Sequence, residues 1–339
     1  MSEEYITLDG LCQQLSISRA TGRNWLRLGK IESQGIDPAG QMYFTEEYVS
    51  NLKQSLETGE RRSLRSRRNK RYVSGKGLYD RYVSDICEST DTVKSLVDKL
   101  ERQNICVTEM VMRTLLADCA LKLLVSSGEI TVDREIFPAY IDGSLTIGVW
   151  SALIDDIIQD KKAALSWANN NKNFMDTNYY YQKGEDVLGL LYMSIRDAGS
   201  RKAAGSYYTP TKVVRTLISD VTGDMGSRIS EGGKRLFDPC CGTGNFLIQL
   251  PDDIELNNIY ACDIDELSVQ LARFNLALGR LSGRGHVNVD EAIRTIYEHI
   301  ERRDFISEYR NDSECGGDDK KLLADPGYDI IIGNPPWGY

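Results

Sequence analysis

Histidine is scarce in this sequence, with two residues in 339, and the eight cysteines form no Cys-x-x-Cys pair. Structural zinc sites are usually built from cysteine and histidine at such short spacings, so we expect no metal site. The adjacent Cys240 and Cys241 cannot easily bridge each other in a tight turn. We therefore expect reduced thiols that pack as small apolar groups in a reducing compartment.

Long apolar runs are also missing, since no stretch of about 18 uncharged apolar residues is present to span a bilayer. The first ten residues, MSEEYITLDG, are acidic and lack the basic and apolar regions of a secretory signal. We expect a cytoplasmic protein with no membrane partner. The net charge of -9 argues against a protein that coats nucleic acid along its whole surface, but it leaves room for a local basic face.

Residues 1–57 are predicted to form a small helical module. A helix is expected from Ser18, a favourable cap, to Leu28, and a short strand at residues 42–44 precedes a helix at residues 46–56. This layout of helix, turn, helix and wing resembles the excisionase and MerR-like winged helix-turn-helix family. The resemblance implies that the second helix reads DNA base edges through Arg19, Thr21, Arg23 and Asn24.

Gly22 departs from that family, which normally packs an aliphatic side chain at this place. A glycine inside a helix costs about 1 kcal/mol relative to alanine. The alternative interpretation of the module is a three-helix adaptor that does not contact DNA.

Basic residues are concentrated directly after this module, where seven of the eleven residues 61–71 are Lys or Arg. Such a run is usually a solvated face or a linker, but it can also neutralise several phosphates. Its position beside a suspected winged helix favours nucleic acid, and we expect contacts from Arg61, Arg62, Arg65, Arg67 and Arg68. Residues 58–77 are accordingly expected to form a basic linker.

The rest of the chain divides into a helical domain at residues 78–200 and an α/β domain at residues 201–339. In the first, apolar residues recur at spacings of three and four, and the polar stretch at residues 169–173 is expected to be a loop. In the second, strands are expected at residues 235–237, 259–262 and 328–332, and helices at residues 211–224, from Asn245 and at residues 267–278. Alternating strands and helices indicate a parallel sheet, whose ligands bind at the carboxyl ends of the strands.

A glycine turn follows the first of these strands, in the string Asp238-Pro239-Cys240-Cys241-Gly242-Thr243-Gly244-Asn245-Phe246. Its glycines tolerate positive φ and let a ligand approach the backbone. Leu247 stands where a dinucleotide fingerprint has its third glycine, and no Gly-Lys-Ser/Thr follows, so nicotinamide and nucleoside triphosphate sites are disfavoured. At the end of the next strand, Asp263 suits a contact with ribose hydroxyls, whereas Asp265 suits a helix N-cap.

The sequence Asn334-Pro335-Pro336-Trp337 follows a buried strand. Consecutive prolines fix the backbone and withhold amide donors, so the Asn334 side-chain oxygen and the Pro335 carbonyl are available to accept hydrogens from an amine. Trp337 offers a flat face on which a base can stack. The alternative for this tetrapeptide alone is a surface turn with a tryptophan plug.

Together these strings resemble the gamma-type N6-adenine DNA methyltransferases of type I and type IIG restriction-modification systems, over residues 185–339. The resemblance implies a Rossmann-like α/β fold that binds S-adenosylmethionine. It assigns cofactor contacts to Tyr208, Thr209, Asp238, Cys240, Gly242, Gly244, Asn245, Asp263, Asp304 and Phe305. It assigns the catalytic role to Asn334, Pro335 and Trp337.

The family's mechanism implies that the target adenine is flipped out of double-stranded DNA, stacks on Trp337 and is polarised by Asn334, with no metal. Two other interpretations remain at this point. One is a DNA-binding or regulatory protein with an inactive methyltransferase remnant, and the other is a methyltransferase that acts on glutamine side chains or RNA guanine.

Complete members of the family continue beyond the catalytic motif with further strands and a target-recognition domain. The chain is therefore expected to be a truncated gene product or one half of a split enzyme, with an incomplete parallel sheet. In the second case a further polypeptide supplies the missing catalytic half and the target-recognition domain.

Overall fold

The computed structural model describes residues 6–15, 17, 19–27, 31–36, 42–58, 82–103, 105–196, 209–223, 233–283, 288–305 and 327–335. The chain divides into two compact units, residues 1–74 and residues 75–339, which are described separately below. Within the described ranges, no helix combines the length and apolarity needed to cross a bilayer.

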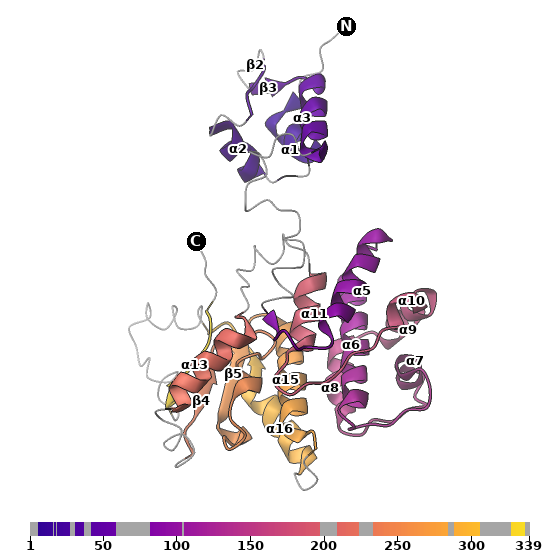
Figure 1. The fold of residues 1–339 in the computed structure, drawn as a ribbon, viewed down its shortest axis with the longest axis vertical. Helices are drawn as coiled ribbons and strands as arrows, with labels where there is room; N and C mark the ends of the chain where they lie inside the picture. The colour runs from indigo at the N-terminus through magenta and orange to yellow at the C-terminus, as the bar shows by residue number, and fades with distance from the viewer. Residues whose placement is uncertain are drawn as a thin grey trace, which may run out of the picture. The chain divides into compact units, whose positions relative to one another are not determined.

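The N-terminal unit is a small three-stranded antiparallel sheet with three helices (Figure 1). Its elements are β1 (Ile6–Thr7), α1 (Leu8–Gln14), α2 (Arg19–Arg27), β2 (Gly35–Ile36), β3 (Met42–Phe44) and α3 (Glu46–Thr58), with strand order β1-β3-β2. A separate core forms around Leu11, Trp25, Phe44 and Val49, all of which are buried. The predicted strand at residues 42–44 and the helix that begins at Glu46 are confirmed.

Gly22 has a packing reason in this unit. A Cβ atom at position 22 would lie 2.4 Å from the Sγ of Cys12 and 3.2 Å from the Cδ1 of Leu8. The missing side chain therefore lets α2 lie directly against α1, and the lower helix propensity of glycine is offset by this close approach.

We predict that Gly22→Ala destabilises the N-terminal unit, although alanine is the better helix former. Cys12→Ala should partly restore stability in the double variant because it removes the clashing sulfur. The matched control is Gly279→Ala in α15, where the nearest atom to the new Cβ lies 4.0 Å away. This substitution should stabilise the protein by up to about 1 kcal/mol because alanine is the better helix former. Hydrogen exchange of α1 and α2 in the full chain measures the effect, and unchanged protection in Gly22→Ala would contradict it.

The second unit begins with a layer of helices. These are α5 (Thr90–Arg102), α6 (Glu109–Ser126), α7 (Ile136–Ile141), α8 (Trp150–Ile158), α9 (Lys161–Asn170), α10 (Lys172–Met175) and α11 (Val187–Ile195). The loop expected at residues 169–173 is wrong, because α9 and α10 are separated by Asn171 alone. Burial of Phe174 and its stacking against Trp167 override the weak helix propensity of the asparagines.

The α/β part contains a parallel sheet of four described strands in the order β6-β5-β4-β7. The strands are β4 (Leu236–Asp238), β5 (Ile259–Asp263), β6 (Ile300–Arg302) and β7 (Ile330–Ile331), and the helices are α13 (Thr211–Gly223), α15 (Glu266–Leu281) and α16 (Val289–His299). The predicted α/β fold with a parallel sheet is confirmed. Within the described residues, β7 pairs with β4 only.

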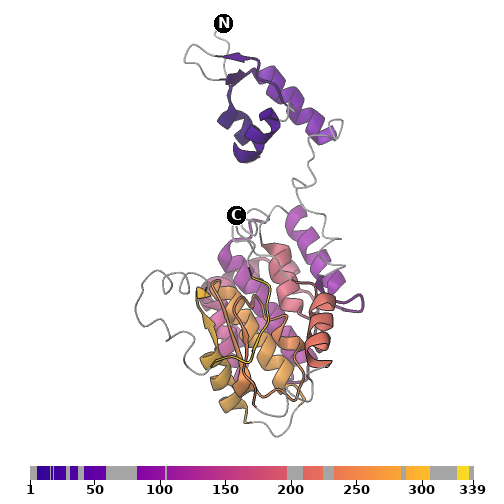
Figure 2. The same cartoon turned by 90° about the vertical axis from the view of Figure 1, so that its left-hand side faces the viewer.

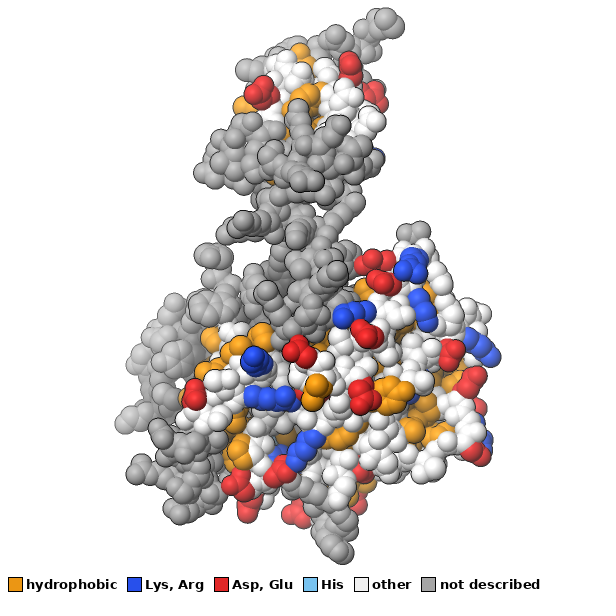
Figure 3. All heavy atoms as spheres, in the orientation of Figure 1, with side chains coloured by type: hydrophobic (Ala, Val, Ile, Leu, Met, Phe, Trp, Pro, Cys, Tyr) orange, Lys and Arg blue, Asp and Glu red, His pale blue; other side chains and the backbone are white. Residues whose placement is uncertain are grey.

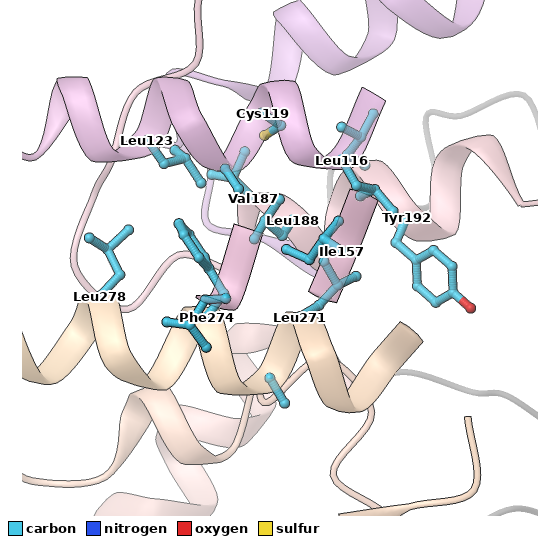
Figure 4. Packing of buried hydrophobic residues seen from close by; sticks show 14 of the residues in the cluster. Leu116, Cys119, Leu123, Ile157, Val187, Leu188, Tyr192, Leu271, Phe274 and Leu278 are labelled. Carbon is cyan, nitrogen blue, oxygen red and sulfur yellow. The ribbon is translucent and has the colours of Figure 1, made fainter. Parts of the chain in front are cut away.

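Helix α15 joins the sheet to the helical layer, because it packs against β5 and β6 on one side and against α8 and α11 on the other (Figures 1 and 2). Leu271, Phe274 and Leu278 of α15 face Leu116 and Ile157 of α6 and α8 in one continuous core (Figure 4). The helical layer and the sheet therefore share their apolar interior. Acidic and basic side chains are interspersed over the described part of the face drawn in Figure 3.

One predicted element of the α/β part differs from the structure. The helix expected from Asn245 is instead a series of turns and a 3-10 helix, η1 (Leu247–Gln249), because Leu250 precedes Pro251 and takes an extended conformation. The sequence pattern does not predict α16 and β6, because they follow each other without an intervening glycine or proline.

Candidate active site

Polar side chains follow the carboxyl ends of all four described strands of the parallel sheet. Asp238 and Asp263 end β4 and β5, Asp304 lies two residues after β6, and Asn334 lies three residues after β7. The strand order places them along one edge as Asp304, Asp263, Asp238 and Asn334. This edge is where open α/β sheets bind ligands.

The turn after β4 is held by its neighbours on two sides. Gly242 and Gly244 have φ values of 54° and 88°, which favour glycine. A Cβ on Gly244 would lie 3.2 Å from the Cα of Ala272, so glycine also allows the turn to rest on α15. The Gly242 amide donates to Asp263 Oδ2 at 2.8 Å, and the Asp265 amide donates to Asp263 Oδ1 at 2.9 Å. Asp263 thus holds the turns that follow β4 and β5 and retains lone pairs for a further donor.

Asp238 is fully buried at the end of β4. Its Oδ1 accepts from the Cys240 amide at 3.0 Å, whereas its Oδ2 has no hydrogen-bond partner among the described residues. A Cβ on Gly333 would lie 2.4 Å from Asp238 Oδ1, so glycine lets the end of β7 lie against this carboxyl and brings Asn334 to the same place. Desolvation, with a smaller effect from Asp263, raises the pKa of Asp238 to about 8.

The half-buried Cys240 lies among the carboxylates at this edge. Desolvation and then the charges of Asp238, Asp263 and Asp304 raise the pKa of its thiol to about 12. The three carboxyl groups therefore act on one small region of space, and a cationic ligand bound there would favour the ionised form of each.

Thr209 and Asn245 meet beside the glycine turn. The Asn245 Nδ2 donates to the Thr209 carbonyl at 2.8 Å, and the Thr211 hydroxyl donates to the Asn245 Oδ1 at 3.2 Å. The buried Thr209 Oγ1 has no partner within the described residues. After β6, the ring of Phe305 packs edge-on against the ring of Phe237 in β4, with ring centroids 5.2 Å apart.

Residues 183–339 match the model of a family described as N-6 DNA Methylase. The matched residues make up slightly less than half of the chain. A relative, the type II methyltransferase M.VspI of Vibrio sp. strain 343, is 29% identical over 209 residues, which cover 61% of this chain and 43% of that protein. The methylase subunit of the type I restriction enzyme MjaIX of Methanocaldococcus jannaschii is 25% identical over 163 residues, which cover 45% and 23%.

The chain thus spans less than half the length of these curated relatives. Among solved structures, the cryo-EM structure of a DrdV–DNA complex covers 73% of this chain and 27% of its own, with 17% identity and a TM-score of 0.32.

The N-6 DNA Methylase region contains every residue that the sequence analysis placed in the cofactor and catalytic sites. The structure brings together Thr209, Asn245 and the strand-end residues of the sheet, with Asn334 half-buried and Pro335 exposed. Tyr208 and Trp337 lie outside the described residues, as do Arg61, Arg62, Arg65, Arg67 and Arg68.

Asp265 has a different environment from the one expected of a helix cap. It precedes α15, but no backbone amide of the first turn donates to its carboxylate, which instead accepts from Tyr192, Arg196 and Ser268. Tyr192, Arg196 and the buried Asp186 are not among the site residues predicted from the sequence. The only sequence signal for Asp186 is its place as an N-cap before an apolar helix.

We predict that Asp238→Asn changes the pH dependence of stability. The native protein keeps a proton on Asp238 up to about pH 8, whereas the unfolded chain loses it near 3.8. The stability that this carboxyl contributes is therefore greatest below pH 4 and is lost as pH rises toward 8, by at most about 1.4 kcal/mol per pH unit.

Urea unfolding of the wild type and the Asn variant at pH 5, 6, 7 and 8 measures this effect. The wild type should lose stability relative to Asp238→Asn with each step, because the amide does not titrate. The exposed Asp253→Asn provides a surface control. Parallel stability curves for wild type and Asp238→Asn would show that Asp238 does not hold its proton in the folded state.

Proposed function

We propose that the second unit transfers a methyl group from S-adenosylmethionine to the N6 amine of adenine in DNA, within a restriction-modification system. The observation that carries the proposal is the alignment of Asp304, Asp263, Asp238 and Asn334 along one sheet edge inside the N-6 DNA Methylase region. The named methyltransferase relatives support the reaction class.

The residues at this edge fit S-adenosylmethionine, which carries positive charge on its sulfonium and amino groups. Asp263 has lone pairs left for ribose hydroxyls, and the buried Asp238 Oδ2 lacks a partner among the described residues, as expected of an atom that faces a ligand. The glycines of the turn leave room for close backbone approach. The cofactor, when bound, supplies an activated methyl group.

The remaining chemistry is positioning by this chain. The Asn334 side-chain oxygen and the Pro335 carbonyl are proposed to accept the two hydrogens of the adenine amine, which directs its lone pair toward the methyl group. Pro335, which has no amide hydrogen, keeps a competing donor away from the amine. Adenine reaches this position when it is flipped from the duplex, and Trp337 is proposed to stack on it.

We predict that Asn334→Ala and Asp263→Ala separate catalysis from cofactor binding. Asn334→Ala should lower methyl transfer at least about 100-fold and leave S-adenosylmethionine affinity within about threefold, because Asn334 is proposed to bind the acceptor amine and not the cofactor. Asp263→Ala should weaken cofactor binding about tenfold or more. Calorimetry measures the affinity, and mass spectrometry of digested plasmid DNA detects N6-methyladenine.

These outcomes also discriminate the alternatives. Cofactor binding without any transfer by wild type would favour a regulatory protein with an inactive methyltransferase region. Methylation of glutamine peptides or RNA guanine in place of DNA would replace the proposed acceptor. We further propose a second polypeptide that adds target recognition, so the assay is run on the full chain and repeated with cell extract, where increased DNA methylation is expected.

We also propose that α2 of the N-terminal unit contacts DNA. Arg19 and Arg23 are exposed on this helix, whereas Gly22 and Trp25 are buried against the unit's core. Arg19 pairs with Asp9 at 2.8 Å in the free protein, and both side chains are more than half exposed. An exposed pair of this kind contributes at most about 1 kcal/mol, so a phosphate can displace it.

We predict that Arg23→Ala lowers DNA affinity of the full chain about three- to tenfold and reduces the salt dependence of binding by about one phosphate contact. Lys53→Ala on the exposed surface of α3 is the matched loss of one positive charge. Fluorescence anisotropy at several salt concentrations measures both variants. Equal losses for Arg23→Ala and Lys53→Ala would indicate that net charge alone, and not α2, determines binding.

A further inference from the structure

A buried carboxylate of the helical layer contacts the glycine turn of the active site. Asp186 is fully buried and accepts four hydrogen bonds. Its Oδ2 accepts from the hydroxyls of Tyr82 and Thr243, both at 2.5 Å, and its Oδ1 accepts from the Gly189 amide and the Asn275 Nδ2, both at 2.7 Å. No step of the proposed reaction uses this group.

Thr243 is held at its side chain and at its main chain. It lies between Gly242 and Gly244, and its hydroxyl donates to Asp186. Its carbonyl accepts from the Asn275 Nδ2 at 2.9 Å. The conformation of the turn is therefore fixed by Asp186, which precedes α11, and by Asn275 of α15.

The contact requires α11 to approach the turn closely. A Cβ on Gly189 would lie 2.1 Å from Asp186 Oδ2 and 2.4 Å from Thr243 Oγ1. Glycine inside a helix lowers the stability of that helix. At position 189 this cost is accepted because any larger residue would clash with the hydrogen-bonded side chains of Asp186 and Thr243.

The other end of α11 contacts the turn that follows β5. Tyr192 and Arg196 donate to Asp265, which lies two residues after Asp263. Helix α11 with its flanking residues thus bridges the turns that follow β4 and β5, and both of these turns contain residues proposed to bind the cofactor.

We propose that Asp186 is a positioning residue for cofactor binding, which fixes Thr243 and so keeps Gly242 and Gly244 in the conformation that receives an adenosine-containing ligand. This inference rests on the proposed function. It adds that the helical layer, through Asp186, affects the affinity of the glycine turn for the cofactor. A charged acceptor makes stronger hydrogen bonds than a neutral one, and Asp186 offers two oxygens to four donors.

The test uses Thr243→Val, which keeps the shape of threonine but removes its hydroxyl, together with Asp186→Asn and the double variant. Each single variant should weaken S-adenosylmethionine binding about tenfold, which corresponds to about 1.4 kcal/mol. The double variant should be little weaker than either single variant, because both remove the hydrogen bond from the Thr243 hydroxyl to a charged carboxylate. Thr243→Ser, which retains the hydroxyl, should bind within about twofold of wild type.

Two readouts separate positioning from general loss of stability. At saturating cofactor the methyl-transfer rate of Thr243→Val should return to within about threefold of wild type. Hydrogen exchange of the peptide covering residues 240–246 should increase in Thr243→Val and Asp186→Asn, without cofactor present. The control Asp118→Asn perturbs another buried carboxylate, which pairs with Lys122 at 2.6 Å in α6, and should lower stability without changing cofactor affinity.

The outcomes distinguish the two proposals. If wild type binds cofactor and Thr243→Val binds equally well, the positioning role is wrong and the proposed function stands. If wild type binds no cofactor, the proposed function fails, and exchange at residues 240–246 still decides whether Asp186 holds the turn. Equal losses of cofactor affinity in Asp118→Asn and Asp186→Asn would show that Asp186 affects binding only through the stability of the fold.

Discussion

Close packing around the turn after β4 is the constraint on which the rest of the second unit depends. Three glycines permit it, because Gly189 admits α11, Gly244 admits α15 and Gly333 admits the end of β7. A side chain at any of them would meet atoms at 2.1 to 3.2 Å. The polypeptide thus brings three separate segments onto one turn. Gly242 and Gly244, proposed to bind the cofactor, lie in this turn, and Asn334, proposed to bind the amine, follows the end of β7.

The same packing determines the electrostatics of the site. Burial raises the pKa of Asp238 and of Asp263, because water that would solvate their charge is excluded. Burial also raises the pKa of Asp186, but there four hydrogen-bond donors oppose the effect. One buried carboxyl is thus satisfied by the protein, while Asp238 retains an oxygen with no partner among the described residues. This difference distinguishes a structural carboxylate from one that is suited to a ligand.

The sequence could predict the groups at the sheet edge but not what supports them. Asp238, Asp263 and Asn334 follow apolar strands, and parallel strands bring their carboxyl ends to one edge, so local pattern and topology suffice. The contact between Asp186 and Thr243 joins residues 57 positions apart in the chain, and no periodicity signals it. Helix α16 and strand β6 could not be predicted for a similar reason. No turn residue separates them, and the chain leaves the helix where β6 begins to pair with β5.

The helical layer helps to shape the candidate active site. The N-6 DNA Methylase region begins at residue 183, yet Tyr82 and the core residues Leu116 and Ile157 precede it. Phe274 of α15 packs against Trp150 of α8, with ring centroids 6.2 Å apart, and burial of each such side chain contributes about 1.5–3 kcal/mol. Without the layer, α15 would expose this apolar face and Asp186 would lose the Tyr82 hydroxyl. Since α15 and Asp186 hold the glycine turn, the residues before the family region contribute to the shape of the site within it.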